Sequence, residues 1–138
     1  MFATESWIPF WACNSVAYKL HFGVDWQPPI RIELYLKGAA CPFEEWLDGL
    51  RDRAGRAKVW VQVDRLSLGN FGKCRFLKGG IGELKVAWGP GYRVYFATLN
   101  QNAVLLLCGG DKSTQQADIA RAYGYWADFQ ERHHGQDT

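Results

Sequence analysis

The side chains best suited to chemistry in this sequence are three cations and one phenol. Lys85, Arg93 and Tyr95 lie in two apolar stretches on either side of Gly89-Pro90-Gly91. Lys112 stands in a glycine-rich segment just before a stretch with helical spacing. Guanidinium and ammonium groups bind phosphate and stabilise negative charge that builds on it during a reaction. These four residues are our candidates for a positively charged catalytic site.

Gly89-Pro90-Gly91 predicts a tight turn between two strands, Ile81–Trp88 and Tyr92–Leu99. With Trp88 opposite Tyr92, Lys85 falls opposite Tyr95, with Cβ atoms about 5 Å apart. Side chains alternate along a strand, so one face is predicted to be core, namely Leu84, Val86, Trp88, Tyr92, Val94 and Phe96. The opposite face then carries Glu83, Lys85, Ala87, Arg93 and Tyr95. A solvated strand face would carry the same residue types, and that alternative stays open.

Lys112 lies in Gly109-Gly110-Asp111-Lys112-Ser113-Thr114, which predicts a flexible turn that delivers a lysine to a helix. Free backbone N–H groups and the helix dipole favour phosphate at such a position. The segment is not a P-loop, because Asp111 stands where that motif needs glycine. The alternative is a plain helix start, with Ser113 and Gln116 as a capping box.

Positive charge is concentrated in the middle of the chain, although the formal net charge is only +2. Between Arg51 and Arg93 there are ten Lys and Arg residues but only three Asp and Glu residues. A concentrated positive field suits a polyanion such as RNA, DNA or an acidic partner protein. A basic surface that is merely solvated is the alternative.

Other functional classes find little support in the residue pattern. The four cysteines (Cys13, Cys41, Cys74 and Cys108) lack Cys-x-x-Cys spacing and paired histidines. This argues against a zinc site and a disulfide framework, and it fits a reducing cytoplasm. We find no signal peptide pattern and no run near the roughly 18 apolar residues of a membrane helix. We therefore expect a soluble cytoplasmic protein without a zinc site.

Hydrophobic periodicity divides the chain into short elements. Besides the two hairpin strands, it predicts strands at 30–37, 74–78 and 103–108, and helices at 42–50, at 56–68 and from about 114. Alternating valines in the second helix would also suit a strand, whereas the apolar run at 103–107 is typical of a strand covered on both faces. The order predicts an α+β domain with a small, mainly antiparallel sheet of four to five strands, two N-terminal helices and a C-terminal helix. We expect the domain to span residues 30–132, between an extension of uncertain structure (1–29) and a disordered tail (133–138).

Several motifs occur together in this chain. They are Phe43-x-x-Trp46-Leu47-x-x-Leu50, Leu68-Gly69-Asn70, Gly82-Glu83-Leu84, Gly89-Pro90-Gly91-Tyr92-Arg93-Val94-Tyr95-Phe96, Leu106-Leu107-x-Gly109-Gly110-Asp111-Lys112-Ser113-Thr114-Gln115 and Asp118-Ile119. From Ile30 to about Phe129 the chain thereby resembles the RelE/ParE superfamily of toxins, and most closely its addiction-module killer, or HigB-like, branch. Such toxins normally begin near position 30, so an upstream start could have added the residues before it.

The resemblance implies the toxin of a type II toxin–antitoxin system, neutralised by a helix-turn-helix antitoxin, that cleaves mRNA on the ribosome without metal or cofactor. It implies that Lys85, Arg93 and Lys112 are the basic residues of the reaction. The terminal tyrosine of these RNases has no clear counterpart here, and Tyr95 could instead donate a proton or stack on a base. Further candidates for RNA binding are Lys73, Arg75 and Lys78.

In this hypothesis the ribose 2′-OH attacks the adjacent phosphate, which Arg93 and Lys112 hold. Lys85 could accept the hydroxyl proton if neighbouring cations favour its neutral form, and Glu83 is a rival base. Two alternatives stay open, namely a non-catalytic ParE-like toxin that poisons DNA gyrase and a chain that has lost its activity. We expect the antitoxin to cover basic surface around residues 51–65.

Overall fold

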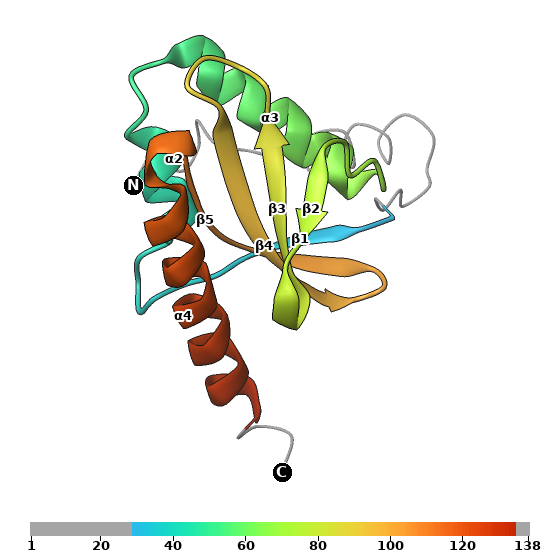
Figure 1. Cartoon of the computed structure of the whole chain (residues 1–138). Helices are drawn as coiled ribbons and strands as arrows, with labels where there is room; N and C mark the ends of the chain where they lie inside the picture. Colours follow the sequence, from blue (N-terminus) through green and yellow to red (C-terminus); the bar gives the residue numbers. More distant parts are fainter. Residues whose placement is uncertain (1–28, 135–138) are drawn as a thin grey trace.

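A computed structural model describes residues 29–134 of the chain (Figure 1). Most of the predicted extension at 1–29 and residues 135–138 of the predicted tail lie outside these described residues. The elements are β1 (Arg31–Leu34), α2 (Pro42–Asp48), α3 (Arg53–Ser67), β2 (Cys74–Phe76), the short helical turn η2 (Lys78–Gly80), β3 (Ile81–Val86), β4 (Tyr92–Asn100), β5 (Ala103–Gly110), the short helical turn η3 (Lys112–Thr114) and α4 (Gln115–His134).

Five strands form one sheet in the order β1-β5-β4-β3-β2. β1 runs parallel to β5, and the other neighbours are antiparallel. The predicted α+β class, the mainly antiparallel sheet and the placing of the helices are therefore confirmed. The ambiguous segment is the helix α3, as predicted, and α4 continues to His134, past the predicted domain end at 132.

Helices cover both faces of the sheet (Figure 1). α2 and α3 pack on one face, where Phe43 and Val63 join a core that includes Phe96 of β4. α4 lies on the other face, mainly over β5 and β4. All eight residues of β5 are buried, in agreement with the apolar run that predicted a strand covered on both faces. The β3–β2 side of the second face is left without a helix over it, and the candidate site lies there.

The pairing of β3 with β4 differs from the predicted register by two residues. Val86 lies opposite Tyr92, and Lys85 lies opposite Arg93. A shift by two keeps every side chain on its own face of the sheet. Five of the six predicted core residues around this pair, Leu84, Val86, Tyr92, Val94 and Phe96, are accordingly buried.

The β3–β4 connection is a five-residue loop, 87–91, rather than the predicted three-residue turn. The Gly91 N–H donates to the Trp88 carbonyl over 3.0 Å, and Gly91 has a φ of +79°, which only glycine adopts at low cost. Trp88 therefore belongs to the loop and not to the ladder. Its predicted core position is wrong, because the indole is 40% exposed.

Gly109 and Gly110 end β5 and do not form a flexible turn. A Cβ atom on Gly109 would overlap the Trp46 ring of α2, and one on Gly110 would overlap the Asp118 carboxylate of α4. The glycine pair thus allows both helices to approach the strand closely. This is a packing role, in place of the phosphate-binding turn that the sequence predicts.

Asp111 caps the helical turn that leads into α4. Its carboxylate accepts a hydrogen bond from the Ser113 N–H at 2.8 Å, and its own N–H donates to the Thr114 hydroxyl at 3.3 Å. The predicted capping box of Ser113 and Gln116 is therefore wrong. The Asp111 carboxylate already accepts a hydrogen bond from an N–H group at this helix start, where a phosphate would otherwise bind. We therefore expect Lys112 to contribute to the site through its side chain.

Candidate functional site

Lys85 and Arg93 are direct partners on neighbouring strands. Direct partners in an antiparallel pair have Cβ atoms about 5 Å apart, so the observed register brings the two cations closer than the predicted one. The Lys85 side chain is exposed, whereas Arg93 is only 7% exposed. One exposed and one buried cation thus lie side by side on the open part of the sheet.

Lys112 joins this pair from the segment after β5. Lys85, Arg93 and Lys112 line one open pocket of about 350 Å³, together with the 87–91 loop. Gly91 lies between two of them, because a Cβ atom placed on it would be 3.3 Å from Arg93 Nη1 and 3.9 Å from Lys112 Cβ. Three cations from three separate segments therefore surround a single space.

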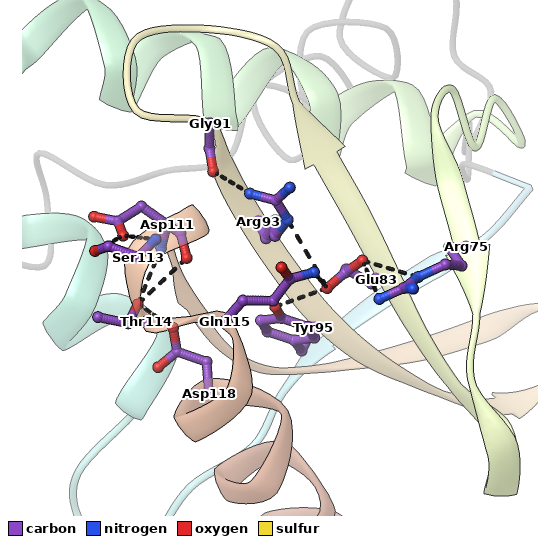
Figure 2. A network of polar contacts seen from close by, with 10 residues as sticks. All are labelled: Arg75, Glu83, Gly91, Arg93, Tyr95, Asp111, Ser113, Thr114, Gln115 and Asp118. Carbon is purple, nitrogen blue, oxygen red and sulfur yellow. Dashed lines mark hydrogen bonds and ion pairs between the residues drawn. The ribbon is translucent and has the colours of Figure 1, made fainter.

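The Arg93 guanidinium is held from two sides, as Figure 2 shows. Its Nη1 donates to the Gly91 carbonyl at 2.8 Å. Its Nε is buried and lies 3.9 Å from Glu83 Oε2, within ion-pair range but without a hydrogen-bond partner among residues 29–134. The guanidinium is thereby oriented before any ligand arrives, which lowers the entropy cost of binding an anion.

Glu83 is the centre of a buried polar network (Figure 2). Its Oε1 accepts from Arg75, whose Nε and Nη2 lie at 3.2 and 3.0 Å. Its Oε2 accepts from the Tyr95 hydroxyl and from Gln115 Nε2, each at 2.9 Å. Arg75, Tyr95 and Gln115 thus all donate to the carboxylate of Glu83, a residue that is 5% exposed.

The network decides the protonation state of Glu83. Burial alone would raise the pKa of Glu83, but hydrogen bonds from Gln115 and Tyr95 and the charges of Arg75 and Arg93 outweigh it. The pKa is therefore lowered from its usual 4.5, and the carboxylate is ionised at neutral pH. A carboxylate with a lowered pKa and fully engaged oxygens is a weak general base. The contacts of Glu83 instead suit a role in positioning Arg75 and Arg93.

Tyr95 is completely buried, and its hydroxyl donates to Glu83. Burial and the neighbouring Glu83 carboxylate raise the pKa of Tyr95 far above its usual value of 10. The phenol therefore stays neutral, and its ring has no free face. The expectation that this residue stacks on a base does not fit its burial, and the structure places it behind the pocket as a support for Glu83.

Two further open pockets adjoin the first. One, of about 390 Å³, shares Lys85 and Arg93 and is also lined by Lys73, Arg75, Glu83 and Gln115. The other, of about 240 Å³, shares Lys73 and Lys85 and reaches α3. We call the three together the basic groove, whose cationic residues are Arg65, Lys73, Arg75, Lys85, Arg93 and Lys112. Among the described residues, Glu83 is the only acid that lines it.

The predicted RNA-binding residues do not all lie in the basic groove. Lys73 and Arg75 line it, whereas Lys78 lies in η2, at the opposite end of β3 from Lys85. The structure thus brings together five of the six predicted cations. Within residues 29–134, no three His, Cys, Asp or Glu side chains are close enough to hold a metal ion, and no helix is both long and apolar enough to cross a bilayer.

Three residues that contribute to this region, Gln115, Trp88 and Asp52, were not predicted from the sequence to do so. Gln115 binds Glu83 from 32 positions away, and no local pattern signals that contact. The predicted three-residue turn extends the strand to Trp88 and so places it in the core, whereas Trp88 lies in the 87–91 loop. Asp52 accepts hydrogen bonds from Trp88 Nε1 at 3.0 Å and from the Gly55 N–H at 2.9 Å. An Asp directly before a helix is a signal for capping, and it was available in the sequence.

The lowered pKa of Glu83 predicts a pH-dependent stability. Since the folded-state pKa lies below the unfolded value, the ionised group stabilises the fold fully above about pH 4.5. This contribution is lost as the pH falls through the folded-state pKa. We expect the free energy of unfolding to drop more steeply below pH 4.5 in the wild type than in Glu83→Gln. Urea unfolding at several pH values measures this, and parallel curves for the two proteins would contradict it.

Comparison with known proteins identifies the family. Residues 45–122, more than half of the chain, match the family described as Phage derived protein Gp49-like (DUF891). A protein of Haemophilus influenzae, described as an uncharacterized protein, is 46% identical over 80 residues, which are 58% of this chain and 81% of that protein. The match includes α3, the β3–β4 hairpin and the first residues of α4, and thus the whole basic groove. The chain belongs to the Gp49-like family, which is a RelE/toxin-like family.

Proposed function

We propose that this protein is the toxin of a type II toxin–antitoxin pair and that it cleaves mRNA, as the HigB-like branch of these toxins does. The observation that carries the proposal is the pocket that Lys85, Arg93 and Lys112 line together. Three cations around one open space suit a phosphodiester whose negative charge grows in the transition state. Membership of a RelE-like toxin family supports the same function and a partner antitoxin.

The proposed reaction is transesterification within the RNA strand. The ribose 2′-oxygen forms a bond to the adjacent phosphorus, and the bond from phosphorus to the 5′-oxygen breaks. The products are a 2′,3′-cyclic phosphate and a 5′-hydroxyl. Arg93 and Lys112 hold the non-bridging oxygens, Lys85 adds a third positive charge beside the same phosphate, and water in the open pocket accepts the 2′-hydroxyl proton. Because the pocket is open, water supplies the proton that the leaving oxygen needs.

Glu83 and Tyr95 support the reaction from behind the pocket. Tyr95 and Gln115 fix the carboxylate, and the carboxylate in turn faces the Arg93 guanidinium. Arg75 receives the other carboxylate oxygen and lines the groove beside it. These contacts orient two arginines toward the RNA backbone, and no bond of the substrate has to change at either supporting residue.

A pair of lysine substitutions tests the assignment of the pocket. We expect Lys112→Ala to lower the cleavage rate by about 10²-fold, since it removes a charge from the transition state. Lys78→Ala removes the same charge outside the groove and is expected to leave the rate unchanged. The rates are measured by mapping new RNA 3′ ends after adding each protein to translating ribosomes. Equal losses in both variants would mean that general charge, and not the pocket, matters.

A ParE-like poison of DNA gyrase is the second candidate, and one observation favours it. The two tyrosines of the hairpin, Tyr92 and Tyr95, are buried and donate to carboxylates, so the described part of the groove offers no free phenol. Gyrase supercoiling measured with the purified protein separates the two functions. Inhibition of supercoiling without new RNA ends would replace the nuclease proposal.

The proposed antitoxin would act by masking the basic groove. Because Arg65 of α3 lines the groove, an acidic partner that binds to this helix would also cover the groove. Inducing the protein in cells should stop growth, and the neighbouring open reading frame should restore it. Growth at the normal rate under full induction would contradict the toxin assignment.

A further inference from the structure

Trp88 is an exposed aromatic side chain in the pocket that holds the three cations. It lines this pocket together with Lys85, Arg93 and Lys112 and is 40% exposed. Exposing this much of an indole to water is unfavourable, because apolar surface gains free energy on burial. The residue is nevertheless held in this place by specific contacts, which calls for a function.

The Trp88 ring is fixed from α3. Its Nε1 donates to Asp52 Oδ2 at 3.0 Å, and the same oxygen accepts from the Tyr92 hydroxyl at 3.1 Å. The other oxygen of Asp52 caps α3 through the Gly55 N–H. Lys58 Nζ lies over the ring, 5.1 Å from its centroid. The indole is thus oriented before a ligand binds, and one of its faces is already covered.

An aromatic plane next to clustered cations matches the two parts of a nucleotide. Proteins that bind single-stranded nucleic acids combine a positively charged groove with aromatic rings on which bases stack. We propose that Trp88 is the stacking platform for the nucleobase next to the phosphate that Arg93 and Lys112 hold. The ligand is single-stranded RNA, because a base within a duplex already stacks on its neighbours. This subsite rests on the proposed nuclease function and gives it a base-reading element.

A second exposed aromatic residue provides the matched control. Phe76 of β2 is 61% exposed, more than Trp88, but it lines none of the pockets of the groove. It packs against Phe71 and Phe96, whose ring centroids lie 6.0 and 6.2 Å away. Exposure alone therefore does not define the subsite, and Phe76→Ala controls for the loss of an exposed ring.

The test measures binding of a short fluorescent 2′-fluoro oligoribonucleotide, which lacks the attacking hydroxyl and cannot be cleaved. An abasic residue is placed at each position in turn, and affinity is measured by anisotropy, with the RNA free and on programmed ribosomes. The wild type should lose about tenfold in affinity at one abasic position. Trp88→Ala should bind the intact RNA about tenfold more weakly and be insensitive at that position. Trp88→Phe, which keeps a ring, and Phe76→Ala should respond as the wild type does.

The results separate this subsite from the proposed function. If Trp88→Ala binds as tightly as the wild type, or shows the same abasic profile, the stacking platform is wrong. The nuclease proposal survives that result as long as Lys112→Ala still weakens binding equally at every abasic position. If neither the wild type nor any variant binds the RNA, free or on the ribosome, both proposals are wrong. Thermal unfolding of each variant shows whether a weaker affinity reflects a damaged fold.

Discussion

Replacing Arg93 by alanine is expected to stop growth arrest and to slow mRNA cleavage by about 10²- to 10³-fold. This is the largest catalytic effect we predict, because among residues 29–134 Arg93 is the only cation of the pocket that is both buried and oriented. Its guanidinium can hold two phosphate oxygens at once, and the preorganised charge acts where negative charge develops. The rate is measured on translating ribosomes, as for the lysine variants.

Arg93→Lys is the informative control for this loss. It keeps the positive charge beside Glu83, so the fold should be preserved, but it removes the planar pair of donors. We expect cleavage between that of the wild type and that of Arg93→Ala. If both variants fold and cleave like the wild type, Arg93 does not contact the phosphate and the proposed site is misplaced.

Replacing Glu83 by alanine is expected to lower the free energy of unfolding by about 3 kcal/mol, the largest effect on stability. The substitution leaves the buried Arg93 without its counter-ion and the Tyr95 hydroxyl without its acceptor. A buried charge that loses its partner costs far more than the net gain of the intact pair. Urea unfolding at pH 7 measures the change.

Glu33→Ala is the matched control for Glu83. Glu33 is also a strand glutamate that pairs with an arginine, but its side chain is 37% exposed and that of Arg31 is 62% exposed. Exposed pairs contribute about 0–1 kcal/mol, so this variant should unfold almost as the wild type does. Equal destabilisation by the two substitutions would show that the Glu83 network does not stabilise the fold.

Much of the fold was predictable because alternation along a strand is robust. The faces of the β3–β4 hairpin are correct although the register is wrong, since an error of two residues leaves each side chain on its face. The apolar run of β5 likewise predicted burial on both sides. Local turn chemistry was less informative, because Gly89-Pro90-Gly91 is compatible with both a three-residue and a five-residue connection. The position of Trp88 depended on that choice.

The composition of the site was predictable only in part. The sequence indicates that Lys85, Arg93 and Lys112 are candidates, and the structure places all three around one pocket. The partners that position them come from distant segments, as with Gln115, and no sequence spacing encodes such contacts. The start of α4 was misjudged for another reason. Asp111 and Ser113 both favour capping, and in the structure Asp111, with an extended backbone, is the cap.

The carboxylate of Asp52 joins three parts of the molecule through three donors, namely the start of α3, the sheet at Tyr92 and the indole of Trp88. A substitution in one of these parts therefore affects the hydrogen bonds of the other two. A relative that replaces the tryptophan leaves one lone pair of the acid unused, and one that replaces the acid frees both the ring and the tyrosine hydroxyl. Positions 52 and 88 should consequently change together across the family, so that loss of the acid accompanies loss of the indole.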